Sequence, residues 1–248
     1  MKISIITVVL NSKETISNSV DSISMQKGVD IEHIVIDGGS TDGTLEFLKK
    51  NIHLFSRLIS EPDRGLYDAM NKGLAIATGE VIGFLHSGDV YENDKVLASV
   101  MKVMESEGLD AVYADIAFFK PSDPLKALRR YRSIRFTPQR IAWGWMPAHP
   151  SLFIRHQVYE RFGRFNTKYK IAGDYEFVAR IFKDGKLRYR YIPEILVRMR
   201  IGGVSTGGWR NTITLNKEVI RACRENGIYT NWLMLLSKYP FKFLEYFR

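Results

Sequence analysis

The chain has 248 residues, of which 45% are hydrophobic and 25% charged, and its single cysteine is Cys223. This composition excludes a disordered chain, a collagen-like repeat and a disulfide scaffold, and the length fits one or two domains. The formal net charge of +9 is unevenly divided: residues 1–119 hold 10 Lys and Arg against 18 Asp and Glu, whereas residues 120–248 hold 26 against 9. The first half is therefore acidic and the second half strongly basic.

The first half of the chain alternates short β-branched runs with amphipathic stretches. The runs predict strands at 3–10, 31–36, 57–60 and 81–85, and the stretches between them predict helices at 15–24, 44–51 and 66–77. Such alternation is typical of βαβ units, which form a parallel sheet with right-handed crossovers. The opening apolar run lacks the basic flank and cleavage site of a signal peptide, so we expect a buried strand and a cytoplasmic protein.

The pattern changes after about residue 118. Residues 121–140 are rich in Pro, Lys and Arg without clear periodicity, and we expect an irregular excursion there. Beyond it the sequence predicts helices at 158–162, 174–183 and 216–224, strands at 188–192 and 195–199, a glycine-rich loop at 202–208 and a basic, aromatic tail at 232–247. No linker of low complexity separates the halves, which favours one domain with a specialised second half.

Polar side chains follow each of the four predicted strands in the first half. Asn11 follows the first, Asp37 the second, Asp63 the third, and Ser87 and Asp89 the fourth. Ligands of parallel α/β sheets bind at the carboxyl ends of the strands, where these loops gather. The alternative is that Asp and Gly only form turns at these positions. The pattern predicts a ligand site at this edge.

The chain has no phosphate-binding G-x-x-x-x-G-K-[ST] loop and no G-x-G-x-x-G after a strand. Phosphate chemistry would then need a metal or Arg and Lys side chains. Asp89 is the leading metal-ligand candidate, because one carboxylate together with substrate phosphates suffices for Mg²⁺ or Mn²⁺. The alternative is that Asp89 caps a helix beginning near Asp94.

Three segments in order resemble the inverting glycosyltransferases of family 2: SIITVVLN at 4–11, VIDGGSTDGT at 35–44, and the run at 79–89. The segment EPDRGLYDAMNKG at 61–73 looks like the branch that builds bacterial exopolysaccharides such as colanic acid. The resemblance implies an α/β, GT-A-like fold: a Rossmann-type, mostly parallel sheet flanked by helices. It also implies a glycosyltransferase domain at 1–205, with a nucleotide-sugar-binding half (1–119) and an acceptor and catalytic half (120–205). Residues 206–248 would form a lid and a basic, aromatic helical extension.

The resemblance also assigns roles to single residues. Donor and nucleotide binding falls to Thr7, Asn11, Asp37, Asp63, Asp68, Lys72, Ser87, Arg198 and Arg200. Many relatives have two acids where this chain has Asp37 and Gly38, so the base stays open. The family's metal motif is reduced to Ser87-Gly88-Asp89, which implies that Asp89 holds a divalent cation, Mg²⁺ or Mn²⁺.

The catalytic base implied by the resemblance is Asp174, in the segment AGDYEF at 172–177, with Glu176 as the second candidate. An inverting transferase needs one carboxylate beside the acceptor hydroxyl. The alternative for Asp174 is a helix cap. His149 is placed in the donor or acceptor pocket, and its alternative is an ordinary packed histidine.

These observations predict transfer of a sugar from a nucleotide-diphosphate donor, with inversion, to a hydroxyl of a lipid-linked glycan acceptor in bacterial surface polysaccharide synthesis. The alternatives are a sugar nucleotidyltransferase and, from a different class, a basic nucleic-acid-binding protein. The basic half and its aromatic tail predict an anionic membrane surface as partner, on the cytoplasmic face of the inner membrane. The acids at the strand ends would repel phosphate, so we expect no nucleic acid.

Overall fold

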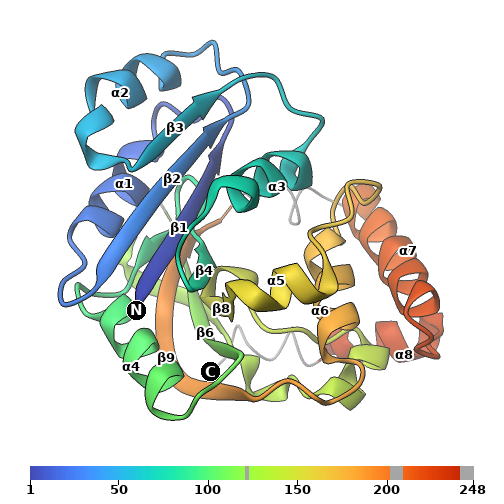
Figure 1. Cartoon of the computed structure of the whole chain (residues 1–248). Helices are drawn as coiled ribbons and strands as arrows, with labels where there is room; N and C mark the ends of the chain where they lie inside the picture. Colours follow the sequence, from blue (N-terminus) through green and yellow to red (C-terminus); the bar gives the residue numbers. More distant parts are fainter. Residues whose placement is uncertain (121–122, 202–208, 241–248) are drawn as a thin grey trace.

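The computed structural model describes residues 1–120, 123–201 and 209–240, and in these ranges it shows one nine-stranded sheet with helices on both faces (Figure 1). The strands are β1 (Lys2–Val9), β2 (Asp30–Asp37), β3 (Arg57–Ser60), β4 (Val81–Phe84), β5 (Val90–Tyr91), β6 (Ala111–Lys120), β7 (Asp123–Tyr131), β8 (Leu152–Arg155) and β9 (Tyr189–Arg200). Their order across the sheet is β3-β2-β1-β4-β8-β6-β9-β5, and β7 pairs with β6.

The first four strands are parallel, as predicted from the βαβ pattern. Their side chains are buried on both faces of the sheet: Ile3, Ile5 and Ile6 of β1 have no exposed surface. Continuous β-branched runs are expected for strands covered on both sides, because neither face meets water. β8 runs antiparallel to both β4 and β6, while β9 runs parallel to β6, so the sheet is mixed in its second half.

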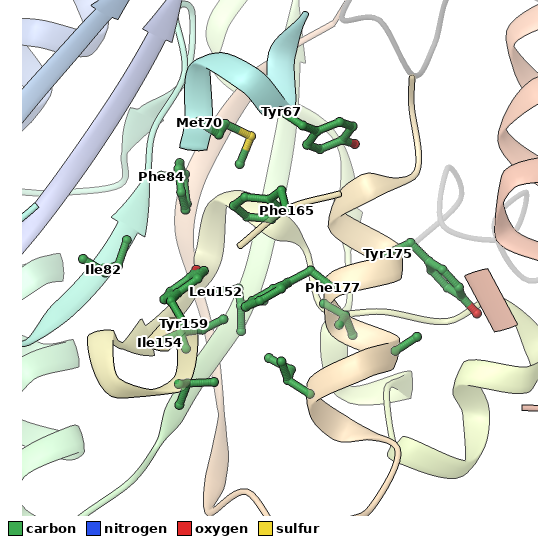
Figure 2. Packing of buried hydrophobic residues seen from close by; sticks show 14 of the residues in the cluster. Tyr67, Met70, Ile82, Phe84, Leu152, Ile154, Tyr159, Phe165, Tyr175 and Phe177 are labelled. Atoms are coloured by element: carbon green, nitrogen blue, oxygen red, sulfur yellow. The ribbon is translucent and has the colours of Figure 1, made fainter. Parts of the chain in front are cut away.

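The helices form two layers. They are α1 (Ile16–Ser24), α2 (Thr44–Lys50), α3 (Leu66–Ile76), α4 (Val96–Ser106), α5 (His156–Phe162), α6 (Gly173–Phe182), α7 (Trp209–Glu225) and α8 (Trp232–Leu236). Residues from α1 and α4 pack on one face of the sheet, and residues from α3, α5, α6 and α7 pack on the other. In the second layer, Tyr67 and Met70 of α3 lie near Phe84 of β4 and Phe165 (Figure 2).

The excursion predicted at 121–140 is wrong for most of its length. β7 pairs antiparallel with β6, and the short 3-10 helices η2 (Ser133–Arg135) and η3 (Pro138–Trp143) follow. The strand has no apolar period because pairing with β6 determines it, and Arg130 on it bonds the fully buried Asp115, with Nη2 and Oδ2 2.7 Å apart. The strands predicted at 188–192 and 195–199 are one strand, β9, whose pairing with β6 shifts register near Asp115.

The C-terminal region is more closely integrated with the domain than a peripheral tail would be. α7 stands beside α6 (Figure 1), and its Val219, Ala222 and Cys223 are buried in the same core as β1 and α3. The loop predicted at 202–208 and the end of the tail, 241–248, lie outside the described residues. In the parts that are described, no helix combines the length and the apolar character needed to cross a membrane.

Candidate active site

The loops after β1 and β2 are joined at the carboxyl edge of the sheet. Asn11 adopts a left-handed backbone conformation, with φ of 47°, and its Oδ1 accepts a bond from the Thr41 amide at 2.9 Å. The Asn11 amide donates to Ser40 Oγ at 2.8 Å. Asn11 therefore shapes the rim of the predicted donor site and is itself exposed.

Two of the predicted donor-binding residues are fully buried. Thr7 donates its hydroxyl to Leu85 O at 2.8 Å, which ties β1 to the end of β4. The Asp37 carboxylate accepts bonds from the Ser40 amide (3.2 Å) and the Ser60 hydroxyl (2.6 Å). Neither residue has exposed surface, and the hydrogen bonds of both side chains hold the loops at this edge in place.

Asp63 lies where the second acid of the family motif is missing. A Cβ placed on Gly38 would meet Asp63 Oδ2 at 2.2 Å, so the carboxylate occupies the space of a side chain at position 38. Asp63 Oδ1 accepts a bond from the Gly65 amide at 2.8 Å. Leu10, 53% exposed, lies 3.5 Å from the same point. The Asp63 carboxylate and the Leu10 side chain therefore both lie next to the Gly38 backbone.

Asp68 and Lys72 fix the segment that carries Asp63. Lys72 Nζ donates to Pro62 O at 2.9 Å and pairs with Glu61 at 2.8 Å. Asp68 accepts a bond from the Arg64 amide at 3.1 Å, and this bond is the main reason why its pKa is lowered. The two residues were predicted to bind the donor, and in the structure their described partners belong to the β3–α3 segment.

The loop after β4 is held by helix α1. Ser19 Oγ donates to His86 O at 3.0 Å and accepts from the Gly88 amide at 2.9 Å. The hydroxyls of Ser87 and Thr15 lie 2.7 Å apart. Gly88 has φ of 92°, a conformation that favours glycine, and it turns the chain so that Asp89 lies beneath the loop.

Asp89 is buried, with 6% of its surface exposed, and no hydrogen-bond partner of its carboxylate occurs among the described residues. Burial alone raises its pKa to about 8. An unpaired buried carboxylate is costly unless a cation compensates it, so this residue fits a divalent-cation site. Across residues 1–120, 123–201 and 209–240 no group of three or more His, Cys, Asp and Glu gathers into a cage, which leaves the remaining ligands to phosphate and water.

Arg198 and Arg200 lie at the C-terminal end of strand β9, before the predicted lid. Arg200 lies beside the Asp89 loop, since its Cβ is 3.8 Å from the position of a Cβ on Gly88. Arg198 pairs with Glu92 at 3.8 Å and lies over the Phe119 ring. The stem of Arg200 therefore lies against the loop that carries Asp89, whereas Arg198 contacts Glu92 and Phe119.

Asp174 begins the first turn of α6 and is partly exposed. Its Oδ1 accepts bonds from the Tyr175 amide (2.8 Å) and the Tyr67 hydroxyl (3.2 Å). Burial raises the pKa of the carboxyl to about 6, and the two hydrogen bonds oppose that rise. A carboxylate with this pKa is ionised at pH 7 and is still basic enough to accept a proton.

Glu176 is not available as a base. Its two carboxylate oxygens accept bonds from Arg180 Nε (3.0 Å) and Nη2 (2.9 Å), and only 5% of its surface is exposed. The second candidate predicted from the sequence is therefore a structural ion pair. The Arg four residues later on the same helix was the sequence signal for it.

His149 stacks on His86, with ring centroids 6.0 Å apart and an interplanar angle of 13°. The ring also lies against Phe84 and Phe165. Burial lowers the pKa of His149 to about 4 and that of His86 to about 3, so both imidazoles are neutral at pH 7. His86 Nδ1 is buried and without a hydrogen-bond partner in the described parts of the chain.

Three residues near the site were missed by sequence reasoning: His86, Tyr67 and Glu218. His86 directly precedes Ser87 at a strand end, and that position could have indicated it. Tyr67 and Glu218 gave no local signal, because their partners near Asp174 are distant in the sequence.

The mixed α/β sheet with flanking helices matches the fold of the solved GT-A glycosyltransferases reported below. The chain belongs to glycosyl transferase family 2, whose model matches residues 4–183. The family and the fold class predicted from the sequence are thus confirmed.

Relatives of this chain carry glycosyltransferase names. It is 32% identical over 228 residues to the PGL/p-HBAD biosynthesis glycosyltransferase of Mycobacterium bovis, covering 88% of this chain and 82% of the relative. It is 29% identical over 192 residues to the chondroitin synthase of Pasteurella multocida, covering 75% of this chain and 19% of that one.

Solved structures share the fold. TarS 1-349 of S. aureus in complex with UDP superposes with a TM-score of 0.70 at 18% identity, covering 96% of this chain and 70% of that one. The match to the longer TarS chain covers 39% of its length. The mannosyltransferase PcManGT of Pyrobaculum calidifontis, in complex with GDP-Man and Mn²⁺, gives a TM-score of 0.66 at 21% identity, covering 90% of this chain and 63% of that one.

Proposed function

We propose that this glycosyltransferase moves a sugar from a nucleoside-diphosphate donor to a hydroxyl of a lipid-linked glycan acceptor, with inversion, in bacterial surface polysaccharide synthesis. The observation that carries the proposal is the pair of carboxylates with different environments. Asp89 is buried and its carboxylate has no hydrogen-bond partner among the described residues, and Asp174 is partly exposed with a pKa of about 6. Two carboxyl groups with separated pKa values suit a cation ligand and a general base.

In this proposal Asp174 takes the proton of the acceptor hydroxyl while that oxygen forms a bond to the anomeric carbon. The bond from the anomeric carbon to the donor's phosphate oxygen breaks, and its electron pair leaves with the nucleoside diphosphate. One displacement inverts the anomeric carbon. Tyr67 keeps its proton throughout, because burial and the Asp174 carboxylate raise the pKa of its phenol well above the usual value.

The base of the donor would lie on the surface formed by Leu10, Gly38 and Asp63. A carboxylate only accepts hydrogen bonds, so it selects a base that presents a ring N–H, as uracil and guanine do. UDP and GDP-Man, held by the two structural relatives above, carry these bases. Asp63 is the residue to which we assign this contact.

A divalent cation would be held by Asp89 together with the diphosphate of the donor. When bound, such a cation offsets the negative charge on the departing diphosphate. Arg200 adds a second positive charge beside the same loop, and its planar guanidinium suits phosphate oxygens.

The acceptor side would face an anionic membrane on its cytoplasmic surface. Apolar side chains are exposed on and before α8: Tyr229 is 78% exposed, Leu233 82% and Trp232 44%. Residues 226–240 contain no acid, so no negative charge opposes an anionic surface there. Aromatic and aliphatic side chains of this kind settle at the level of lipid headgroups.

Co-sedimentation with vesicles containing anionic lipid tests the membrane contact. We expect Leu233→Glu to lower the bound fraction several-fold, whereas Ile52→Glu, which changes an exposed isoleucine between α2 and β3 in the acidic half, leaves it unchanged. If both variants bind the vesicles equally well, the membrane contact lies outside α8.

A panel of nucleotide sugars, scored by release of nucleoside diphosphate with and without Mn²⁺, tests the reaction. We expect Asp174→Asn to bind the productive donor with wild-type affinity and to lose transfer by about 10²-fold or more. Release of pyrophosphate instead would indicate a nucleotidyltransferase, and wild-type turnover in the variant would remove Asp174 from the base role.

A further inference from the structure

Helix α7 reaches the active site although it lies beyond residues 4–183, which the family model matches. Its Glu218 accepts hydrogen bonds from three consecutive backbone amides. Oε1 bonds Lys170 N at 2.8 Å, and Oε2 bonds Ile171 N at 2.9 Å and Ala172 N at 2.8 Å. Successive N–H groups that point at one carboxylate form an anion-binding nest, and bonds to a charged acceptor are the stronger kind.

The segment held by Glu218 leads directly into the helix that carries Asp174. Ala172 is the residue before α6, and Asp174 lies in the first turn. Ile171 is fixed from both sides, because its N–H donates to Glu218 and its carbonyl accepts the Tyr67 hydroxyl at 2.7 Å. The same hydroxyl lies 3.2 Å from Asp174 Oδ1. The position of Asp174 therefore depends on a clamp between α3 and α7.

We propose that Glu218 is a positioning residue for the proton acceptor: it fixes segment 170–172 and thereby aims the Asp174 carboxylate at the acceptor. The inference rests on the proposed function, in which Asp174 is the base. It makes α7 a part of the active site, whereas the sequence suggested a lid and a tail after residue 205.

Because Glu218 is charged, a positioning role predicts a change in the pH–rate profile, which a merely structural contact would not cause. Besides its own amide and burial, the groups that act most strongly on the pKa of Asp174 are Tyr67, the Tyr175 amide and Glu218. The first two lower its pKa, and the Glu218 carboxylate raises it. Removing that charge leaves the lowering influences in place, so the pKa of Asp174 should fall and the acid limb of the pH–rate profile should move to lower pH.

The test compares Glu218→Gln with Glu225→Gln, a carboxylate on the same helix that bonds the Tyr169 hydroxyl at 2.7 Å and does not act on Asp174. Rates are measured against pH at saturating donor and Mn²⁺, so that Asp89 stays ionised. For Glu218→Gln we expect kcat to fall about 10- to 100-fold, as for a misaligned reacting group, with unchanged donor KM and an acid limb at lower pH. For Glu225→Gln we expect the acid limb of the wild type.

Glu218→Asp keeps the charge and shortens the side chain, so its acid limb should stay at the wild-type pH while kcat falls less. A Glu218→Gln protein with wild-type kcat and acid limb overturns the inference. If Glu218→Gln does not fold, Glu218→Asp decides alone: reduced kcat at unchanged donor KM supports positioning, and wild-type kcat overturns it. Asp174→Asn distinguishes failure of the proposed function from failure of this inference. Full activity of Asp174→Asn refutes the proposed function. An inactive Asp174→Asn together with an unaffected Glu218→Gln refutes only the role of Glu218.

Discussion

Replacing Tyr67 by Phe should move the acid limb of the pH–rate profile to higher pH. The phenol donates to Ile171 O at 2.7 Å and lies 3.2 Å from Asp174 Oδ1, where it lowers the pKa of the carboxyl. A hydrogen bond to a charged group contributes about 1.5–3 kcal/mol, and this longer, shared bond belongs at the low end. Because about 1.4 kcal/mol corresponds to one pKa unit, we expect the limb to rise by about one unit from its position near pH 6.

The ring itself should stay in place in this variant. A Cβ on Gly173 would lie 2.7 Å from the Tyr67 ring, so the ring is tightly packed and Phe fills the same space. At pH 7 the ionised fraction of Asp174 would then fall from about nine-tenths to about one-half, and the rate with it. Loss of the bond to Ile171 O should also lower the free energy of unfolding by about 1–2 kcal/mol.

The assay is kcat against pH between 5 and 9 at saturating substrates, together with thermal unfolding. Tyr131→Phe is the matched control, because the Tyr131 hydroxyl donates to Met146 O at the same 2.7 Å and does not act on Asp174. The control should lose similar stability and keep the wild-type limb. A limb that stays in place or moves to lower pH in Tyr67→Phe would refute the assignment of Asp174 as the titrating base.

Three further outcomes follow from the site. Burial keeps Asp89 protonated up to about pH 8 in the folded protein but only up to about pH 4 in the unfolded chain, so the free energy of unfolding without metal should fall as the pH rises from 4 to 8. Asp89→Asn should remove this fall, which is on the order of 5 kcal/mol at most. Thermal unfolding of both proteins at pH 4 and pH 8 measures the difference. Asp63→Ala should raise the donor KM about 10- to 100-fold at unchanged kcat, and equal KM would exclude Asp63 from base contact. Gly173→Ala should cost about 1–3 kcal/mol by pushing a Cβ into Tyr67, and wild-type stability would show that the ring can move.

The sequence predicted the sheet of the first half because its information is local. Each β-branched run and each amphipathic stretch carries its own period, and the four parallel strands follow from their alternation. β7 could not be predicted in this way, since its residues are paired by β6 rather than by an apolar period. The helix predicted at 216–224 lies within α7, but the contacts of α7 with segment 169–172 could not be predicted, because they join parts of the chain that are far apart in sequence.

The positions of polar residues at the strand ends could be predicted from the sequence, whereas their hydrogen-bond partners could not. Strand ends were located correctly, but a strand end does not tell whether a polar group faces a ligand or its own loop. Asp37 and Thr7 turn inward to bond Ser60 and Leu85, whereas the half-buried Asp63 lies over Gly38. Family motifs place residues in the chain, and hydrogen-bond partners decide which of them remain free to act.

In the proposed function, the segment at 61–73 links the donor-binding end of the site to the base. Asp63 lies over Gly38 at the donor end, and Tyr67, four residues later, lies over Gly173 beside the proposed base. In both places a side chain from this segment occupies the space that a Cβ would need. Glycine at position 38 therefore leaves room for Asp63, and glycine at position 173 leaves room for Tyr67. Lys72 and Asp68 fix the segment by ion pairs and hydrogen bonds. In the proposed function, donor recognition and placement of the base therefore both depend on this one short segment.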